Sequence, residues 1–326
     1  MIPIRGLRLA ATCAVILALF VVMLGAYTRL TDAGLGCPDW PGCYGHMVLP
    51  LTEALNPQVE TVKAWTEMAH RYVAGSLGLL IVGLAWGALR GRLYGKRFPV
   101  VLPLTLLLLL GFQAALGMWT VTLKLLPIVV MGHLLGGMLI FTCLSYFRWQ
   151  LSAVKTTDLP SVRAFVNAGI VLVFCQIALG GWVSSNYAGI ACIGFPRCNG
   201  QWFPLSHLAH AFNVFSSIGA NYQGGLLDNE TRVTIQVIHR LGAYVVTTYV
   251  LGLSSLILIK AKARALRITA IVAVGLVALQ FLLGVINVLY LLPLWSAVAH
   301  NGVAALLLGS MVSMRYFTTK GVAHGG

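Results

Sequence analysis

Long apolar stretches alternate with short polar connections along nearly the whole chain. Each stretch reaches about 20 predominantly apolar residues, the length that a helix needs to cross a bilayer. Because the runs are long and unbroken, they favour helices over the strands of a membrane barrel. The pattern therefore predicts eight membrane-spanning helices, at residues 7–27, 64–89, 99–121, 129–148, 164–184, 233–259, 268–290 and 295–315.

The first apolar run follows Arg5 and Arg8, as the apolar core of a secretory signal would. However, the run continues into Gly25-Ala26-Tyr27-Thr28-Arg29, which is not a small-residue cleavage site. We therefore interpret residues 7–27 as a retained signal-anchor helix that belongs to the fold.

The second half of the chain repeats the features of the first half in the same order. Cysteines six residues apart follow spans one and five, a His-Arg pair opens spans two and six, a Gln and a Leu-Gly pair mark spans three and seven, and a histidine opens spans four and eight. The matching residues are Cys37, Cys43, His70, Arg71, Gln113, Gly117 and His133 in the first half, and Cys192, Cys198, His239, Arg240, Gln280, Gly284 and His300 in the second.

This duplication predicts an all-α integral membrane protein built from two pseudo-symmetric four-helix bundles, residues 1–150 and 151–326. With four spans in each half, the two repeats have the same orientation across the membrane. All four odd-numbered spans also end in a Leu-Gly pair, which suggests an older two-helix unit.

Composition and charge agree with a membrane protein. Only 9% of the residues are charged, against about 25% in soluble domains. The net charge of +14 is distributed unevenly, since seven of the eight acids (all but Asp158) lie on one side of the predicted membrane. Fifteen of the 22 basic residues lie on the other side: Arg5, Arg8, Arg90, Arg92, Lys96, Arg97, Arg148, Lys155, Arg163, Lys260, Lys262, Arg264, Arg267, Arg315 and Lys320.

This asymmetry follows the positive-inside rule, which places both termini in the cytoplasm and the long loops 28–63 and 185–232 outside. The basic excess is therefore a topology signal, and it does not indicate a nucleic-acid partner.

Four histidines, His70, His133, His239 and His300, open the even-numbered spans and should lie at similar depth near the outer leaflet. An ionisable residue inside a bilayer is costly unless it has a partner. A single histidine is readily explained by a hydrogen bond to a neighbouring helix, but four at equivalent positions favour a ligand role.

The ligand that fits this pattern is haem. Zinc needs three or four donors, and neither half repeats an acid or a cysteine on a third helix at the same depth. Two facing imidazoles in a helix bundle instead suit a haem iron. Gly132, Gly136, Gly137 and Gly302 either admit a porphyrin or simply allow close helix packing. Arg71 and Arg240 either bind haem propionates or extend to the membrane surface as isolated cations.

One carboxylate breaks the symmetry of the halves. Glu67 precedes His70 by three residues and lies on the same helix face, whereas the equivalent residue in the second half is Gln236. Arg29 and Asp32 likewise correspond to Ser184 and Tyr187. Since only the first half adds a carboxylate to its histidines, that half is the better candidate for chemistry, and the second half for a fixed cofactor.

The loop cysteines predict two disulfides, Cys37–Cys43 and Cys192–Cys198, because both pairs face an oxidising compartment. Either bond acts as a structural staple or as a redox-active group, and the redox role is better placed in the first pair.

With these motifs, the chain resembles the haem A synthase family of bacteria and mitochondria, and within it the branch that carries loop cysteines. The matching segments run from span one to span eight: residues 25–41, Glu67-Met68-Ala69-His70-Arg71, Gly132-His133, His239-Arg240 and His300-Asn301.

The resemblance implies an oxygen-dependent oxidoreductase that converts a methyl group of haem O to the formyl group of haem A. It implies that His70 and His133 hold the substrate haem, that His239 and His300 hold a haem b cofactor, and that Glu67 is essential to turnover. Glu67 would act as a proton shuttle, a general base or a stabiliser of positive charge.

A haem O synthase is the partner that the resemblance implies. The resemblance leaves open which electron donor is used and whether the chain forms a homo-oligomer in the inner membrane. Two rival functions share the histidines: a bis-histidine cytochrome b that carries electrons, and a haem carrier. A thiol oxidase would need the cysteines but not the histidines.

The charge asymmetry predicts the outcome of a reporter-fusion experiment. Alkaline phosphatase, which is active only outside the cytoplasm, should be active when fused after residue 45 and inactive when fused after residue 94. The reverse pattern would contradict both the orientation and the oxidising environment assumed for the cysteines.

Overall fold

The computed structural model describes residues 4–48, 60–94, 99–152, 154, 156, 159–215 and 217–319, and the regular secondary structure in these ranges is helical. Of the charged residues used to predict the topology, Lys96, Arg97, Lys155, Asp158 and Lys320 lie outside the described residues. The helices are α1 (Ile4–Leu30), α2 (Thr61–Leu93), α3 (Val101–Thr122), α4 (Pro127–Gln150), α5 (Pro160–Ser185), α6 (Leu208–Ala211), α7 (Asn229–Lys260), α8 (Arg264–Leu289) and α9 (Leu294–Phe317).

All of these helices except the four-residue α6 are long and apolar enough to cross a membrane, so the predicted all-α membrane fold is confirmed. Most of them extend a few residues beyond the predicted spans, because a helix continues past the hydrocarbon boundary until a cap ends it. At α7 this cap is Asp228, whose side chain accepts a hydrogen bond from Thr231 N at 2.8 Å. That bond and a second one from the Thr231 hydroxyl hold the pKa of the Asp228 carboxyl below its usual range.

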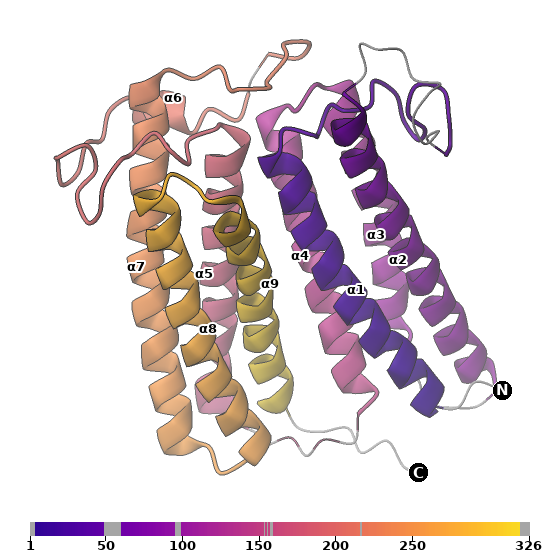
Figure 1. The fold of residues 1–326 in the computed structure, drawn as a ribbon. Helices are drawn as coiled ribbons and strands as arrows, with labels where there is room; N and C mark the ends of the chain where they lie inside the picture. Colours follow the sequence, from indigo (N-terminus) through magenta and orange to yellow (C-terminus); the bar gives the residue numbers. More distant parts are fainter. Residues whose placement is uncertain are drawn as a thin grey trace.

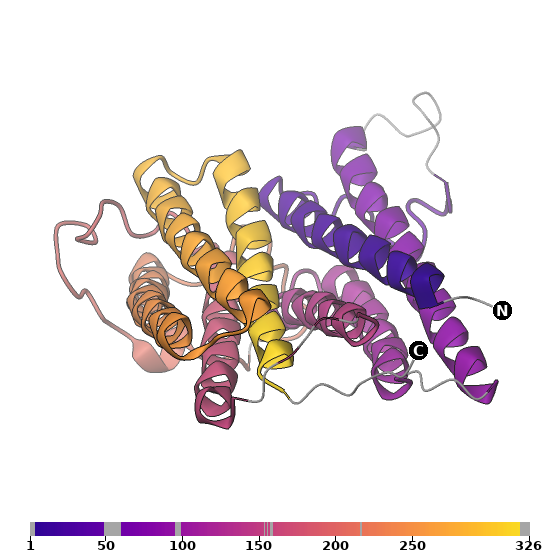
Figure 2. The same cartoon turned by 90° about the horizontal axis from the view of Figure 1, so that it is seen from below.

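The eight long helices stand side by side, and the long loops with α6 gather at one end of the molecule (Figure 1). The first residue of α1 and the last residue of α9 lie at the opposite end. Seen from below, α1–α4 and α5 with α7–α9 form two adjacent groups (Figure 2).

The helix contacts are consistent with two pseudo-symmetric bundles. Within the first half, α1 packs on α2 and α4, and α3 packs on α2 and α4; within the second half, the same contacts join α5 with α7 and α9, and α8 with α7 and α9. The halves meet where α1 packs on α9 and α4 packs on both α5 and α9.

The loop backbone repeats as well. Four residues with positive φ in the first half have counterparts with positive φ in the second, at offsets of 155 or 167 residues: Asp32 and Tyr187, Tyr44 and Asn199, Lys124 and Leu291, Leu125 and Leu292. Positive φ is uncommon for residues other than glycine, so its recurrence at matching positions supports a duplicated local structure.

The contact surface between the halves packs small residues against large ones. A Cβ at Gly302 of α9 would meet the Met23 side chain of α1 at 3.0 Å, and one at Gly309 would meet Phe141 of α4 at 2.9 Å. Because lipid tails give helices no hydrophobic reason to associate, close packing of this kind is what holds membrane helices together.

Candidate functional site

The four predicted histidines lie at the loop end of the bundle. Each one stands six to ten residues after the first residue of its helix, α2, α4, α7 or α9, which corresponds to a depth of about 9–15 Å along the helix axis. The four helices all begin at the loop end, so the two pairs share one level of the membrane.

In the first half the structure brings His70 and His133 together. Their ring centroids are 6.4 Å apart, and the ring planes are inclined by 77°. A metal lies about 2.0–2.1 Å from a coordinating imidazole nitrogen, so this separation leaves room for one metal atom between the rings.

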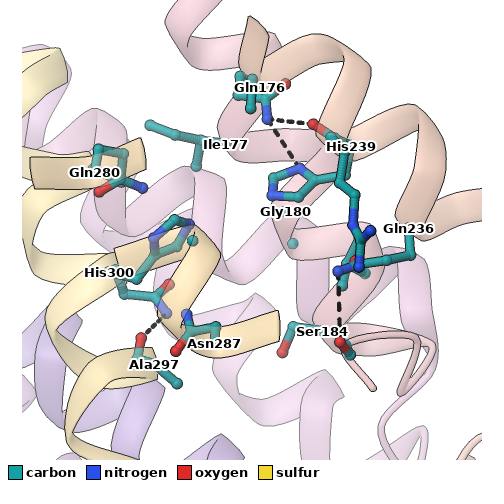
Figure 3. A pocket seen from close by; sticks show the side chains of 18 of the residues that line it. Gln176, Ile177, Gly180, Ser184, Gln236, His239, Gln280, Asn287, Ala297 and His300 are labelled. Atoms are coloured by element: carbon teal, nitrogen blue, oxygen red, sulfur yellow. Dashed lines mark hydrogen bonds between the residues drawn. The ribbon is translucent and has the colours of Figure 1, made fainter. Parts of the chain in front are cut away.

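In the second half His239 and His300 line a cavity of about 490 Å³, which is within the usual range for small-molecule and cofactor sites. The two rings point into the same space from different helices (Figure 3). Within the part of the chain that the structure describes, no group of three or more His, Cys, Asp or Glu side chains could hold a metal ion. The donor set is therefore not that of a zinc site.

Each histidine ring packs directly against a glycine of the preceding odd-numbered span. A Cβ added to these glycines would lie only 3.0–3.4 Å from the Cε1 atom of the ring: Gly25 with His70, Gly117 with His133, Gly180 with His239, and Gly284 with His300. The repeated Leu-Gly pairs were the sequence signal for this contact, although the sequence did not connect them with the histidines. The glycines allow the imidazoles to approach the neighbouring helix backbone and so fix where the rings lie.

Glutamine side chains support two of the four histidine helices. Gln113 Nε2 donates to the carbonyl oxygen of His133 at 2.6 Å, and Gln176 Nε2 donates to that of His239 at 2.9 Å. Gln176 Nε2 also lies 3.1 Å from His239 Nδ1. These glutamines fix the helices that carry the rings, a function that the sequence analysis did not assign to them.

The small residues beside the second histidines have protein neighbours. A Cβ at Gly136 would overlap the Gln113 amide, and one at Gly137 would contact both Gln113 and Val22. Of the two interpretations that the sequence left open, these contacts favour close packing.

Both predicted cysteine pairs are bonded, Cys37 to Cys43 and Cys192 to Cys198. The arginine that follows the first histidine of each half binds the loop that its disulfide closes. Arg71 donates to the carbonyl oxygens of Asp39, Pro41 and Gly42, and Arg240 donates to those of Cys192, Gly194 and Arg197. Neither arginine is an isolated surface cation.

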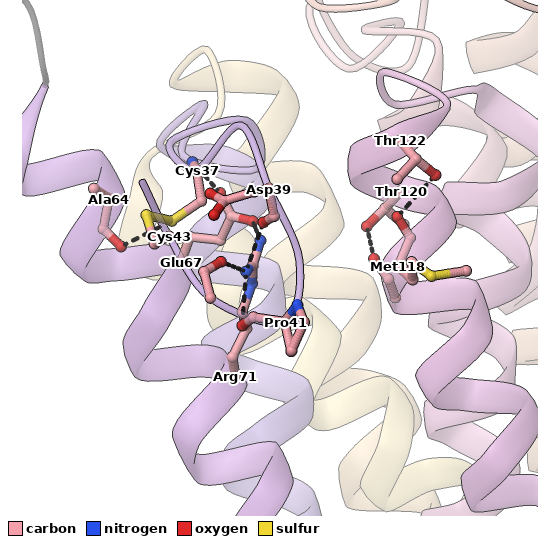
Figure 4. Close-up of polar contacts among 12 residues, drawn as sticks. Cys37, Asp39, Pro41, Cys43, Ala64, Glu67, Arg71, Met118, Thr120 and Thr122 are labelled. Atoms are coloured by element: carbon pink, nitrogen blue, oxygen red, sulfur yellow. Dashed lines mark hydrogen bonds and ion pairs between the residues drawn. A yellow bond between two sulfur atoms is a disulfide. The ribbon is translucent and has the colours of Figure 1, made fainter. Parts of the chain in front are cut away.

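Glu67 lies at the base of the first cysteine loop (Figure 4). Its Oε2 accepts a hydrogen bond from Cys37 N at 2.9 Å, and its Oε1 pairs with Arg71. The carboxylate is buried, so these bonds hold both the loop and the first turns of α2 in place. Its counterpart Gln236 makes only a long contact, 3.5 Å, to Gly189 O.

The cavity of the second half has a cationic outer end. Arg29, Arg232 and Arg240 line it, and the only acid among the described lining residues is Asp32. The buried Nε atoms of all three arginines have no hydrogen-bond partner among the described residues. A buried cation without enough acceptors is unfavourable, so this end of the cavity suits an anionic group.

His207 and His210, to which the sequence assigned no function, lie in the outer loop at α6. His207 Nδ1 is 3.7 Å from Glu230 Oε2, and both side chains are exposed.

Comparison with known proteins gives the same family along nearly the whole chain. Residues 8–312 match the COX15-CtaA family, described as cytochrome oxidase assembly protein. A protein of Shewanella oneidensis named "Heme A synthase" is 44% identical over 93% of each chain. Proteins of the same name from Allorhizobium ampelinum and Chelativorans sp. are 31% and 29% identical over 92% and 93% of this chain, and 87% and 88% of their own.

The glycine contacts generate a prediction about stability. Gly180→Ala should destabilise the folded protein by about 1–3 kcal/mol, because the new methyl group forces the His239 ring or the helix to shift. Gly275→Ala in α8 is the control, since a Cβ there has no neighbour within 4 Å, and it should be neutral or stabilising.

Thermal unfolding of both variants in detergent measures the difference. Equal stabilities would mean that the ring at position 239 tolerates the extra methyl group, and that the glycine does not constrain it.

Proposed function

The chain belongs to the COX15-CtaA family of cytochrome oxidase assembly proteins, and on this basis we propose that it is a haem A synthase. The proposed reaction is the oxidation of a methyl group of haem O to the formyl group of haem A, which a terminal oxidase requires. The observation that carries the proposal is the presence, in each half, of two histidines, from α2 and α4 or from α7 and α9, that lie close together or line one cavity.

The residues of the second half fit a resident haem b. His239 and His300 face the same cavity; His239 Nδ1 lies 3.1 Å from Gln176 Nε2, and the buried Nδ1 atom of His300 has no hydrogen-bond partner among the described residues. The arginines at its outer end match the two carboxylates that a haem carries. When bound, haem b would supply one-electron redox chemistry. The protein itself orients the imidazoles through Gly180, Gly284 and Gln176, and it excludes water with the apolar side chains of the bundle.

The first half is the proposed site of the substrate, haem O, with His70 and His133 as its ligands. The 6.4 Å between the two rings supports this assignment. Glu67 is the proposed residue essential to turnover, and it lies one helical turn before His70. Its bonds to Cys37 N and Arg71 keep its carboxylate in a fixed position beside that site.

Arg71 and Arg240, the two arginines predicted to bind propionates, differ in their contacts. Arg240 lines the cavity of the second half, and its Nε is free of acceptors among the described residues, so we retain it as a propionate-binding residue. Both arginines donate to three loop carbonyls, but Arg71 also has an ion pair with Glu67, and this acidic partner favours a loop-binding role for it instead.

The alternatives are less well supported. A cytochrome b that carries electrons across a membrane places its haems at different depths, whereas the four histidines here share one level. A haem carrier has no use for a buried carboxylate in one half alone.

We also propose the bacterial inner membrane as the location, with both termini in the cytoplasm. Oxygen dependence, delivery of the substrate by a haem O synthase and an external electron donor complete the proposal.

Substitutions in the two histidine pairs should have different effects on the haem that the protein retains. His239→Ala or His300→Ala should remove the haem that the purified protein carries, because each takes away a ligand of the resident cofactor. His70→Ala or His133→Ala should leave that haem in place and abolish haem A formation. Pigment extraction with separation of haems B, O and A measures both effects, and equal loss of pigment from all four variants would contradict separate sites.

Glu67→Gln tests the carboxylate, because the protein itself has glutamine at the equivalent position 236. The variant should fold and bind haem, while haem A formation falls about a hundredfold or more, the usual scale for losing a positioned acid–base group. The assay is the haem A content of cells that express the variant together with haem O synthase.

Arg71→Gln is the matched control, since it breaks the same ion pair but leaves the carboxylate. It should retain more activity than Glu67→Gln. An equal loss in both variants would assign the effect to the loop, and near-normal activity of Glu67→Gln would remove the residue from the mechanism.

A further inference from the structure

Arg29 belongs to the first half of the chain, yet its side chain reaches the second. It lies in the last turn of α1, and its Nη2 donates to the carbonyl oxygen of Ser184 on α5 at 2.7 Å. Its guanidinium carbon lies 4.0 Å from the centre of the Tyr187 ring, within the range of a cation–π contact.

A second pair of residues, Asp32 and Tyr187, joins the two halves beside Arg29. The Tyr187 hydroxyl donates to Asp32 Oδ1 at 3.0 Å, and Asp32 in turn lies 3.7 Å from Arg29 Nη1. The side chain of Arg29 is only 14% exposed, so this group of residues fixes the guanidinium at the boundary between the halves.

The four residues are two repeat-equivalent pairs. An offset of 155 residues relates Arg29 to Ser184 and Asp32 to Tyr187, and both contacts across the boundary join a residue to its own counterpart. If both halves carried arginine at this position, the two cations would repel each other at short range. Because only the first half carries it, a single cation stands at the boundary.

Arg29 also forms part of the wall of the cavity in the second half. Arg29, Leu30 and Asp32 are lining residues of the cavity that contains His239 and His300. The Nε atom of Arg29 is buried and has no acceptor among the described residues, so the protein does not satisfy all the donors of this guanidinium. With Arg232 and Arg240 it gives the outer end three cations against one carboxylate, which leaves an excess that two ligand carboxylates would balance.

We propose that Arg29 of the first half binds a carboxylate of the haem held in the second half, and so acts as a positioning residue across the boundary. This inference rests on the proposed function. One turn earlier, α1 also carries Gly25, whose backbone contacts the ring of His70. The last two turns of α1 therefore contact both histidine sites.

The test uses the purified full-length protein with the haem that it retains. Arg29→Gln replaces the guanidinium with a shorter, neutral amide and so removes the charge and the charged donors, and haem should therefore dissociate about tenfold faster or more, the scale of losing a hydrogen bond to a charged group. The midpoint potential of the retained haem should also fall, because a nearby positive charge favours the reduced iron. Optical redox titration and haem transfer to an acceptor protein measure these effects.

Arg197→Gln is the charge-matched control. Arg197 is a cation of the outer loop that lies over Trp202 and is not a lining residue of the cavity, so its loss should change neither quantity. Arg29→Lys keeps the charge without the planar group of donors, and it should preserve the potential while haem dissociates several times faster. It provides a readout even if Arg29→Gln does not fold, as judged by circular dichroism.

Wild-type dissociation and potential in Arg29→Gln, or wild-type dissociation in Arg29→Lys, would overturn the inference. Absence of haem from the wild-type protein would instead contradict the proposed function, so the two failures are distinguishable.

Discussion

The close approach of a glycine on one helix to a histidine ring on its neighbour is the contact on which both sites depend. An imidazole within a bilayer is unfavourable unless the protein surrounds it, and a long side chain on the facing helix would occupy the space that the ring needs. Gly25, Gly117, Gly180 and Gly284 solve this problem in the same way four times. The contact joins α1 to α2, α3 to α4, α5 to α7 and α8 to α9, so the unit that positions one histidine is a pair of helices. This explains why the Leu-Gly pair recurs with a shorter period than the four-helix repeat.

The duplicated helices form a common framework, and the residues that differ between the halves give the two histidine pairs different surroundings. Glu67 corresponds to Gln236, and Arg29 to Ser184. In each pair the charged residue belongs to the first half, but the two side chains point to different sites. Glu67 holds the cysteine loop beside His70, whereas Arg29 reaches the cavity of His239. The first half therefore contributes one charged residue to each site, in addition to Arg232 and Arg240 of the second half.

The sequence predicted the features that local patterns determine. The eight spans follow from hydrophobic length, and the histidine level follows from their position in helices of the same direction. Other features depend on how the helices pack, which no local pattern reports. The loop contacts of Arg71 and Arg240 are one example, because donors and acceptors are separated by about 30 and 45 residues along the chain. The direction of Arg29 is another, since it follows from the packing of α1 against the second half. The glycines are an intermediate case: the sequence showed that they repeat, but it did not show that each one contacts a histidine ring.

The boundary between the halves is part of the core. Buried residues of all eight long helices belong to one hydrophobic cluster, which continues across the contacts of α4 with α5 and α9. α9 is the most buried of these helices, and Gly309 brings it against Phe141 of α4. The two groups of helices, α1–α4 and α5 with α7–α9, thus repeat the same contacts, whereas neither group encloses its core alone. If a boundary packed in this way opened, the helices would lose their close packing, and Arg29 would lose its contacts with Ser184 and Tyr187. Since both losses are unfavourable within a bilayer, the packing holds the two histidine pairs at one separation.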